Sequence, residues 1–351
     1  MNVRGPVSIN EIVAATGLSR ATVDRVLNKR PGVHPRTQAH VLRMLAHLES
    51  DGHAGGGAAL LTDLRKTYRF KAVVQAGETF TSSMLERVQK LRETDGGGGA
   101  TLQAVASRSD EETIELISSA GRESDGLALV SKNIEPVKSA LKELQGEGKP
   151  VVALVSDLDP TIRRAYVGID NRAAGQLAAF ILGRCLERAA EAKVAVVVGY
   201  FSYLCQEDRE IGFRSLLRQR FPKIEIVEVI KGDDSREATY EAALRLFKQR
   251  RDIAGVYNVA GGNHGLARAI QEGQLAQRPL YIAHEVNEVT EPLLRTGVID
   301  FLITQNVETL IRTSKQVLTD LMLGTGSVRE LNHLPVQVVS EFTLAADTAA
   351  K

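Results

Sequence analysis

The second segment predicted to be helical, near the start of the chain, has one side made of hydrogen-bonding side chains. That side carries Ser19, Arg20, Thr22, Arg25 and Asn28 at helical spacing. Only Asp24 offsets the two arginines. Guanidinium groups pair with phosphates and can bind guanine through two parallel hydrogen bonds, so this surface is suited to a nucleic acid.

Three helices are predicted to position this surface. Ser8 and Glu11 have the spacing of a capping box, which begins a first helix, and Gly17 ends it because glycine adopts a left-handed conformation at low cost. Ser19 is the expected N-cap of the second helix, and Pro35 the expected first residue of the third. Apolar residues at helical spacing predict their shared core: Ile9, Ile12, Val13, Leu18, Val23, Val26, Leu27, Val41, Leu42, Leu45 and Leu48. Two short helices joined at a glycine and braced by a third are typical of a helix-turn-helix domain, which we expect over residues 1–50.

The positive charge of the chain is concentrated in this first segment. Met1–Leu48 contains seven lysines and arginines against Glu11 and Asp24, a balance of +5. The whole chain carries +1, so the remainder carries −4. A basic segment in front of a mildly acidic body indicates that this segment alone meets a polyanion, although a small domain can also carry a few solvated charges.

A linker and a different kind of domain follow. Residues 51–67 are rich in glycine and small side chains, which predicts a linker. From residue 68 onward, amphipathic helical stretches separate most of nine β-branched runs: residues 70–76, 101–107, 126–131, 150–156, 194–199, 224–230, 255–260, 280–286 and 300–306. This alternation predicts an α/β body with parallel, doubly wound sheets. Nine strands are more than a single sheet usually contains, so we expect two sheets in two lobes.

The two cysteines and the hydropathy of the chain indicate the cellular compartment of the protein. Cys185 and Cys205 form no framework of pairs, so both are expected to be reduced. No apolar signal core or membrane-spanning stretch is found in the sequence, which predicts a cytoplasmic protein. A metal-spaced set of cysteines and histidines and a phosphate-binding Walker loop are both missing from the sequence, so no metal or cofactor is expected.

Both parts of the chain resemble the lactose-repressor (LacI/GalR) family. The stretch "EIVAATGLSRATVDRVLN" is similar to the pattern V-A-x-x-A-G-V-S-x-x-T-V-S-R-V-L-N of that family's DNA-binding segment. In the body, "YVGIDNRAAGQLAAFIL", "DREIGFRSLL" and "ITQNVETLI" resemble the family's sugar-binding core, which is similar in fold to periplasmic sugar-binding proteins. The resemblance implies a homodimer, or a higher assembly, that reads a near-palindromic operator in double-stranded DNA. It also implies that a small molecule bound between two lobes changes the affinity for DNA, as in a repressor.

The same resemblance implies residue roles in DNA binding. Arg20 and Ala21 stand at the two positions that the family uses to choose bases, and Arg25 is its second base contact. The side chains expected to hold phosphates are Ser19, Thr22, Asn28 and Thr37. The alternative for each arginine is a solvated surface side chain, and Ser19 can act as a helix cap alone.

The linker departs from the family's pattern. Members usually carry a "P-N-x-x-A-R-x-L" hinge helix, whereas this chain has "GHAGGGAALL" in its place. Three consecutive glycines make a helix there costly, at ~1 kcal/mol each relative to alanine.

In the body, the resemblance implies an effector site. Asp170 and Arg209 stand at ligand-contacting positions, and Glu285 replaces the family's usual aspartate. A carboxylate that accepts and a guanidinium that donates suit neighbouring hydroxyls of a sugar or polyol, although the two could also pair with each other. Further expected effector contacts are Phe80, Asn258, Asn263, Asn287 and Gln305. The implied body spans residues 68–345, with one lobe at about 68–190 and 307–329 and the other at about 191–306 and 334–344.

Two alternative functions were weighed. A nicotinamide-dependent dehydrogenase is disfavoured because "AGGNHG" has Ala260 where G-x-G-x-x-G requires its first glycine. "HEVNE" is not the zinc motif H-E-x-x-H, since its fifth residue is Glu288. A sugar-transport binding protein fits the body but explains neither the basic first segment nor the missing signal core. We therefore expect a DNA-binding regulator and not an enzyme.

Overall fold

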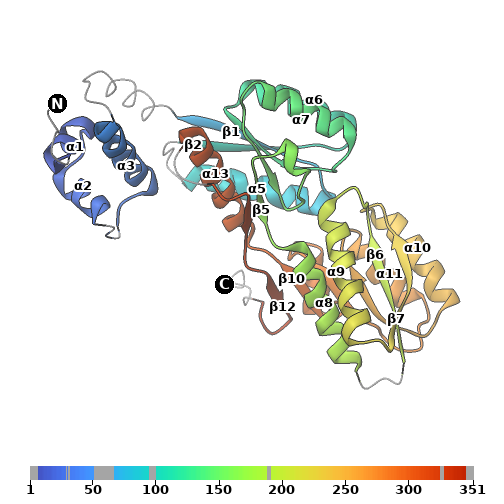
Figure 1. Cartoon of the computed structure of the whole chain (residues 1–351). Helices are drawn as coiled ribbons and strands as arrows, with labels where there is room; N and C mark the ends of the chain where they lie inside the picture. Colours follow the sequence, from blue (N-terminus) through green and yellow to red (C-terminus); the bar gives the residue numbers. More distant parts are fainter. Residues whose placement is uncertain are drawn as a thin grey trace, which may run out of the picture.

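The computed structural model describes residues 7–28, 30, 32–50, 67–94, 100–187, 191–324 and 328–344. Figure 1 shows the N-terminal helices and a two-lobed α/β body. The predicted linker at residues 51–67 lies outside the described residues except for Thr67. In the part of the chain that the structure describes, no helix combines the length and apolarity needed to cross a bilayer.

The three N-terminal helices begin where the capping signals predict, and the first also ends at the predicted glycine. They are α1 (Ile9–Thr16), α2 (Arg20–Leu27) and α3 (Pro35–Ser50). Ser8 Oγ accepts from the amide of Glu11 at 3.4 Å, while the carboxylate of Glu11 accepts from the amide of Ser8 at 2.8 Å. Gly17 has a φ of +64°, the left-handed conformation that glycine adopts without steric cost. Ser19 caps α2 by accepting from the amide of Thr22.

A small apolar core holds these helices together. Ile12, Val23, Val26 and Val41 are fully or almost fully buried, as predicted. The prediction for Leu42 is wrong, because its side chain is 47% exposed. Met44 is buried instead, since i and i+3 lie on one face of a helix whereas neighbouring residues do not.

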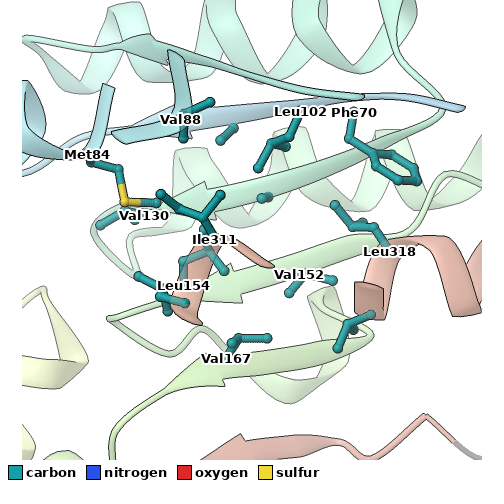
Figure 2. Close-up of a cluster of buried hydrophobic side chains, with 14 of the residues drawn as sticks. Phe70, Met84, Val88, Leu102, Val130, Val152, Leu154, Val167, Ile311 and Leu318 are labelled. Atoms are coloured by element: carbon teal, nitrogen blue, oxygen red, sulfur yellow. The ribbon is translucent and has the colours of Figure 1, made fainter. Parts of the chain in front are cut away.

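The first lobe of the body is built on a six-stranded sheet of order β11-β5-β4-β3-β1-β2, with every neighbouring pair parallel. Its strands are β1 (Tyr68–Val74), β2 (Ala100–Ala106), β3 (Gly126–Val130), β4 (Val151–Leu154), β5 (Ala165–Gly168) and β11 (Leu331–His333). Its helices are α5 (Glu78–Thr94), α6 (Asp110–Glu123), α7 (Glu135–Gly146) and α13 (Val307–Leu323), with a 3-10 turn at Pro160–Ile162. Figure 2 shows the core that strands of this sheet form with α5 and α13, in which Met84 and Ile311 meet Val130 and Leu154.

The second lobe has a six-stranded sheet of order β12-β10-β9-β8-β6-β7, parallel except for the edge strand β12. Its strands are β6 (Ala192–Val198), β7 (Ile224–Lys231), β8 (Ile253–Asn258), β9 (Leu280–His284), β10 (Phe301–Thr304) and β12 (Gln337–Val339). Its helices are α8 (Asn171–Leu186), α9 (Leu204–Arg220), α10 (Arg236–Gln249), α11 (Asn263–Glu272) and α12 (Thr290–Arg295). All nine predicted strands are therefore confirmed, and β5 and β11 are additional. The twelfth strand, β12, lies in the tail segment 334–344 that was expected in the second lobe.

The expected boundary of the first lobe at residue 190 is wrong, because α8 packs on the second sheet. Ala174, Ala178 and Leu182 share a core with β6 and α9. A Cβ on Gly175 would lie 2.0 Å from the carbonyl oxygen of Arg209, so glycine is required where α8 meets α9. The chain thus leaves the first lobe directly after β5.

The chain passes between the lobes at three places among the described residues: from β5 to α8, from β10 to α13, and from β11 to β12. The first and third crossings are joined, since the amide of Leu334 donates to the carbonyl of Gly168 at 2.8 Å. The lobes also touch through loops, where the amide of Asn133 donates to the carbonyl of Ser202 at 2.7 Å. The same contact places the Lys132 ammonium 4.5 Å from the centre of the Tyr200 ring.

Candidate functional site

A cavity of about 460 Å³ lies between the two lobes. Its walls come from the loops and helix starts that follow β1, β3 and β4 in the first lobe and β6 to β9 in the second. These are the carboxyl ends of parallel strands, where doubly wound sheets bind ligands. The volume is in the range of small-molecule sites.

Arg209 on α9 is the buried cation of this cavity, only 5% exposed. Its Nε donates to Asn171 Oδ1 at 2.8 Å, and its Nη1 donates to the carbonyl of Val259 at 3.0 Å. Its Nη2 is buried and has no hydrogen-bond partner. A buried donor without a partner is costly, so this nitrogen is the natural contact for a ligand oxygen.

Asn171 connects that arginine to the first lobe. Its Nδ2 donates to the carbonyl of Val155 at 2.9 Å and to the hydroxyl of Tyr166 at 3.1 Å. Val155 ends β4 with a φ of +62°, a left-handed conformation that costs an L-residue about 1–2 kcal/mol and is rare for a β-branched one. Hydrogen bonds on the carbonyl of Val155 from Asn171 and from the Tyr166 hydroxyl help to hold it there.

Glu285 follows β9 and carries the carboxyl group of the same wall. Its Oε2 accepts from Thr304 Oγ1 at 3.0 Å, and its Oε1 accepts from Gln305 Nε2 at 3.0 Å. Burial raises the pKa of this carboxyl, and the opposing effects of Arg209 and of these hydrogen bonds are smaller. Glu285 also has a φ of +64°, which turns the chain out of the strand at the cavity.

His284, next in the wall, is uncharged at neutral pH. Burial lowers its pKa well below the ordinary value, and the positive charge of Arg209 lowers it further. Its Nε2 lies 2.8 Å from the hydroxyl of Tyr257, whereas its Nδ1 is buried without a partner. The ring therefore offers the cavity a neutral hydrogen-bonding atom.

A second carboxyl group is held by a network across the second lobe. Asp234 Oδ1 accepts from the amide of Gly261 at 2.7 Å, and its Oδ2 accepts from Gln206 Nε2 at 2.9 Å. Gln206 Oε1 in turn accepts from the amide of Gly199. Asp234 has a φ of +50°, so its position depends on these bonds and not on a regular element.

Aromatic and apolar side chains complete the cavity. Phe80 at the start of α5 and Tyr203 before α9 line it from opposite lobes, together with Val130 and Val155. Cys205 is buried in the wall, and burial raises the pKa of its thiol. Cavity-lining residues of the described chain form no group of three or more His, Cys, Asp or Glu arranged to hold a metal ion.

Five of the eight predicted effector residues line the cavity: Phe80, Arg209, Asn263, Glu285 and Asn287. Asp170 is not among the described residues that line the cavity, and its carboxylate caps α8 by accepting from the amide of Ala173. Asn258 is fully buried and shapes the loop before α11, through hydrogen bonds to Gly261 and Asn263. Gln305 stands behind Glu285 and orients it.

Sequence reasoning missed Gln206, Tyr203 and Asp234. Gln206 precedes Arg209 by three residues on α9, so helical spacing could have found it. Tyr203 and Asp234 lie before helices, where no periodic pattern identifies them.

The predicted DNA-contacting residues lie on an exposed surface of the N-terminal helices. Ser19, Arg20, Ala21, Arg25 and Asn28 are exposed, and Thr22 and Thr37 are half-buried. Arg20 Nη1 donates to Asn10 Oδ1 at 3.2 Å, and Asn28 Nδ2 donates to the carboxylate of Asp24 at 2.8 Å. Both contacts are on the surface and can exchange for others.

Comparisons with known proteins concern mainly the body. The chain is 22% identical over 253 residues to Catabolite control protein A of Priestia megaterium, covering 72% of this chain and 73% of that protein. It superposes with a TM-score of 0.72 at 22% identity on GanP, a glucose-galactose binding protein from Geobacillus stearothermophilus, covering 80% of this chain and 100% of that one. An ABC transporter solute binding protein from Burkholderia graminis, in complex with D-arabinose, gives a TM-score of 0.70 at 20% identity over 78% of this chain and 96% of that one. These structures share the two-lobed fold.

A family model also matches the body of the chain. Residues 72–326 match the family described as Periplasmic binding protein domain, which is well over half of the 351 residues. The matched range takes in the cavity and both of its walls. The chain therefore belongs to the periplasmic binding protein domain family.

Proposed function

We propose that this protein is a DNA-binding transcriptional regulator of the LacI/GalR type, a repressor whose operator affinity is changed by a sugar or polyol. The observation that carries the proposal is the exposed surface of α2, with Arg20 and Arg25, in front of a periplasmic-binding-protein body. The similarity to Catabolite control protein A supports it. In this proposal residues 1–50 bind DNA, 51–67 link, and 68–345 bind the effector and dimerise.

DNA binding needs two copies of the N-terminal segment in the proposed homodimer. Each α2 lies in the major groove of one operator half-site, with Arg20, Ala21 and Arg25 at base edges. Ser19, Thr22, Asn28 and Thr37 contact phosphates. The protein acts in the cytoplasm, where the operator is.

The effector binds between the lobes and changes the angle between them. Arg209 Nη2 donates to a ligand hydroxyl and Glu285 accepts from another, while Phe80 packs on the ring. DNA affinity then shifts by the difference in effector affinity between the two lobe arrangements, typically ~1–3 kcal/mol.

The test is selection of duplexes from a random library by the full chain, followed by binding of the selected duplex with and without a sugar panel. We expect a preferred near-palindromic duplex. Arg20→Ala should lower discrimination at one base position by about 1–3 kcal/mol, and Arg25→Ala at a second. Uniform weakening on every duplex would assign these arginines to phosphates instead.

A second candidate is a sugar-binding protein without a DNA function. It is favoured by the likeness to solved sugar-binding proteins. It predicts that the full chain binds a sugar but prefers no duplex over a polyanion such as heparin, and that Arg20→Ala and Arg25→Ala change nothing.

A further inference from the structure

The charged groups around the cavity are predominantly acidic. Among the described residues that line it, two guanidinium groups face four carboxyl groups: Arg209 and Arg236 against Glu78, Asp234, Glu285 and Glu288. Arg236 is exposed at the rim, and its Nε lies 3.8 Å from the carboxylate of Glu237. Arg209 is therefore the cation that a bound molecule would meet in the interior.

Arg209 has little capacity left for an anion. Carboxylates and phosphates are bound most strongly when two guanidinium nitrogens donate side by side. In Arg209 the Nε already donates to Asn171 and the Nη1 to Val259, which leaves Nη2 as the nitrogen without a partner. One nitrogen fits a hydroxyl or ring oxygen better than it fits an anionic group.

The two interior carboxyl groups, those of Glu285 and Asp234, disfavour binding of an anion and favour binding of hydroxyl groups. Each oxygen of Glu285 and each oxygen of Asp234 accepts one hydrogen bond from the protein. A carboxylate oxygen can accept a further bond, so all four can accept from ligand hydroxyls. A ligand carboxylate or phosphate at the same place has no proton to donate and adds repulsion in a site partly shielded from water.

Helix N-termini attract anions, and groups of the protein already accept from backbone amides at two places in the cavity wall. At the start of α9 the amide of Cys205 donates to Ser156 Oγ, and the amides of Gln206 and Glu207 donate to the carbonyl of Tyr203. Next to the start of α11, the amide of Gly261 donates to Asp234. The negative charge of Asp234 therefore already lies against the turn that leads into α11.

Resting on the proposed sugar-binding function, we propose that the cavity selects an uncharged, unphosphorylated sugar or polyol and rejects the corresponding sugar acids and sugar phosphates. The selection comes from one guanidinium nitrogen set among carboxyl groups of the second lobe. The regulator therefore responds to a sugar before its phosphorylation or oxidation, and not to the product of either reaction.

The experiment is isothermal titration of the full chain with sugars in matched neutral and anionic forms at pH 7.5. Each hexose series contains the neutral sugar, its uronic acid and its 6-phosphate, for glucose, galactose and mannose. For xylose and arabinose the anionic form is the 1-phosphate, because C5 belongs to the pyranose ring, and the matching alditols are added. In the series that binds, we expect the neutral form to bind at least tenfold more tightly than either anionic form.

Glu285→Gln separates charge from shape, because the amide keeps the size of the side chain and removes its negative charge. We expect this variant to bind the neutral sugar more weakly and to lower the ratio of acid to neutral dissociation constants at least threefold. Glu241→Gln, at an exposed carboxyl on α10 outside the cavity, makes the same charge change and should leave that ratio as it is.

The outcomes distinguish this inference from the proposed function. An acid or phosphate that binds as tightly as its neutral parent would overturn the charge selection and leave sugar sensing intact. An unchanged ratio in Glu285→Gln would also overturn it. Absence of binding in every series and every form would contradict the sugar-binding function itself, and the selection with it.

Discussion

The two walls of the cavity differ in chemistry. The first lobe contributes Ala76, Phe80, Val130 and Val155 with a few hydroxyl groups, and its one charged contribution among the described lining residues is the exposed Glu78. The second lobe contributes the polar and charged side chains: Gln206, Arg209, Asp234, Arg236, Asn263, His264, His284, Glu285, Asn287 and Glu288. From this difference we expect the second lobe to make the polar contacts that select a ligand and the first lobe to pack apolar surface against it.

The largest effect is expected from Arg209→Met, which removes the buried guanidinium from the recognising wall. The loss of a hydrogen bond to a charged group costs about 1.5–3 kcal/mol, so ligand affinity should fall by roughly 10- to 150-fold. The protein should also melt at a lower temperature, because the buried Oδ1 of Asn171 loses its hydrogen-bond donor. Titration calorimetry and thermal melting measure both. Ligand affinity within threefold of wild type would remove Arg209 from the site.

The pH dependence of Glu285 gives the next effect. Its pKa is raised in the folded protein, so its protonated form is stabilised there, and this contribution to stability is lost as pH rises through the raised pKa. Hydroxyl binding needs the carboxylate, so ligand affinity should fall as pH drops below that pKa, by up to about tenfold per pH unit.

Titrations from pH 5 to pH 8 test this dependence in wild type and Glu285→Gln. The variant should have a flatter affinity profile, and its melting temperature relative to wild type should increase with pH. Parallel profiles in the two proteins would assign the dependence to another group.

A smaller effect is expected from Phe80→Ala in the covering wall. Phe80 is half-buried, and packing of an aromatic ring on a ligand contributes about 0.5–1.5 kcal/mol, so affinity should fall roughly 2- to 12-fold. Phe80→Leu keeps most of the apolar area and is the matched control. If Phe80→Ala weakened binding more than Arg209→Met, the assignment of recognition to the second lobe would be wrong.

The fold could be predicted from sequence where burial leaves a continuous pattern. Parallel strands covered on both faces are read as unbroken apolar runs, which is why the nine strands were found. β5 and β11 lack such a run, because two arginines directly precede β5 and β11 contains an asparagine and a histidine. The assignment of α8 failed for a different reason, because an apolar helix face does not reveal which of two sheets it covers.

The site could be predicted only in part. Arg209 and Glu285 were found through the family's positions, whereas Asp234 could not be found, because long-range bonds to Gln206 and Gly261 hold it in place. Asp170 was misplaced because a short carboxylate in front of a helix serves equally well as a cap. Sequence spacing alone does not separate these two roles.

The single side-chain amide of Asn171 limits how the cavity could be redesigned for another molecule. It bonds both the buried guanidinium of Arg209 and Val155, the strained residue after β4, so a substitution at Arg209 or Asn171 alters the cavity and the crossing between the lobes together. Phe80 and Asn287 line the cavity without a hydrogen bond to that crossing. Libraries for new ligands are best directed at those two positions, where specificity can change while the crossing between the lobes stays intact.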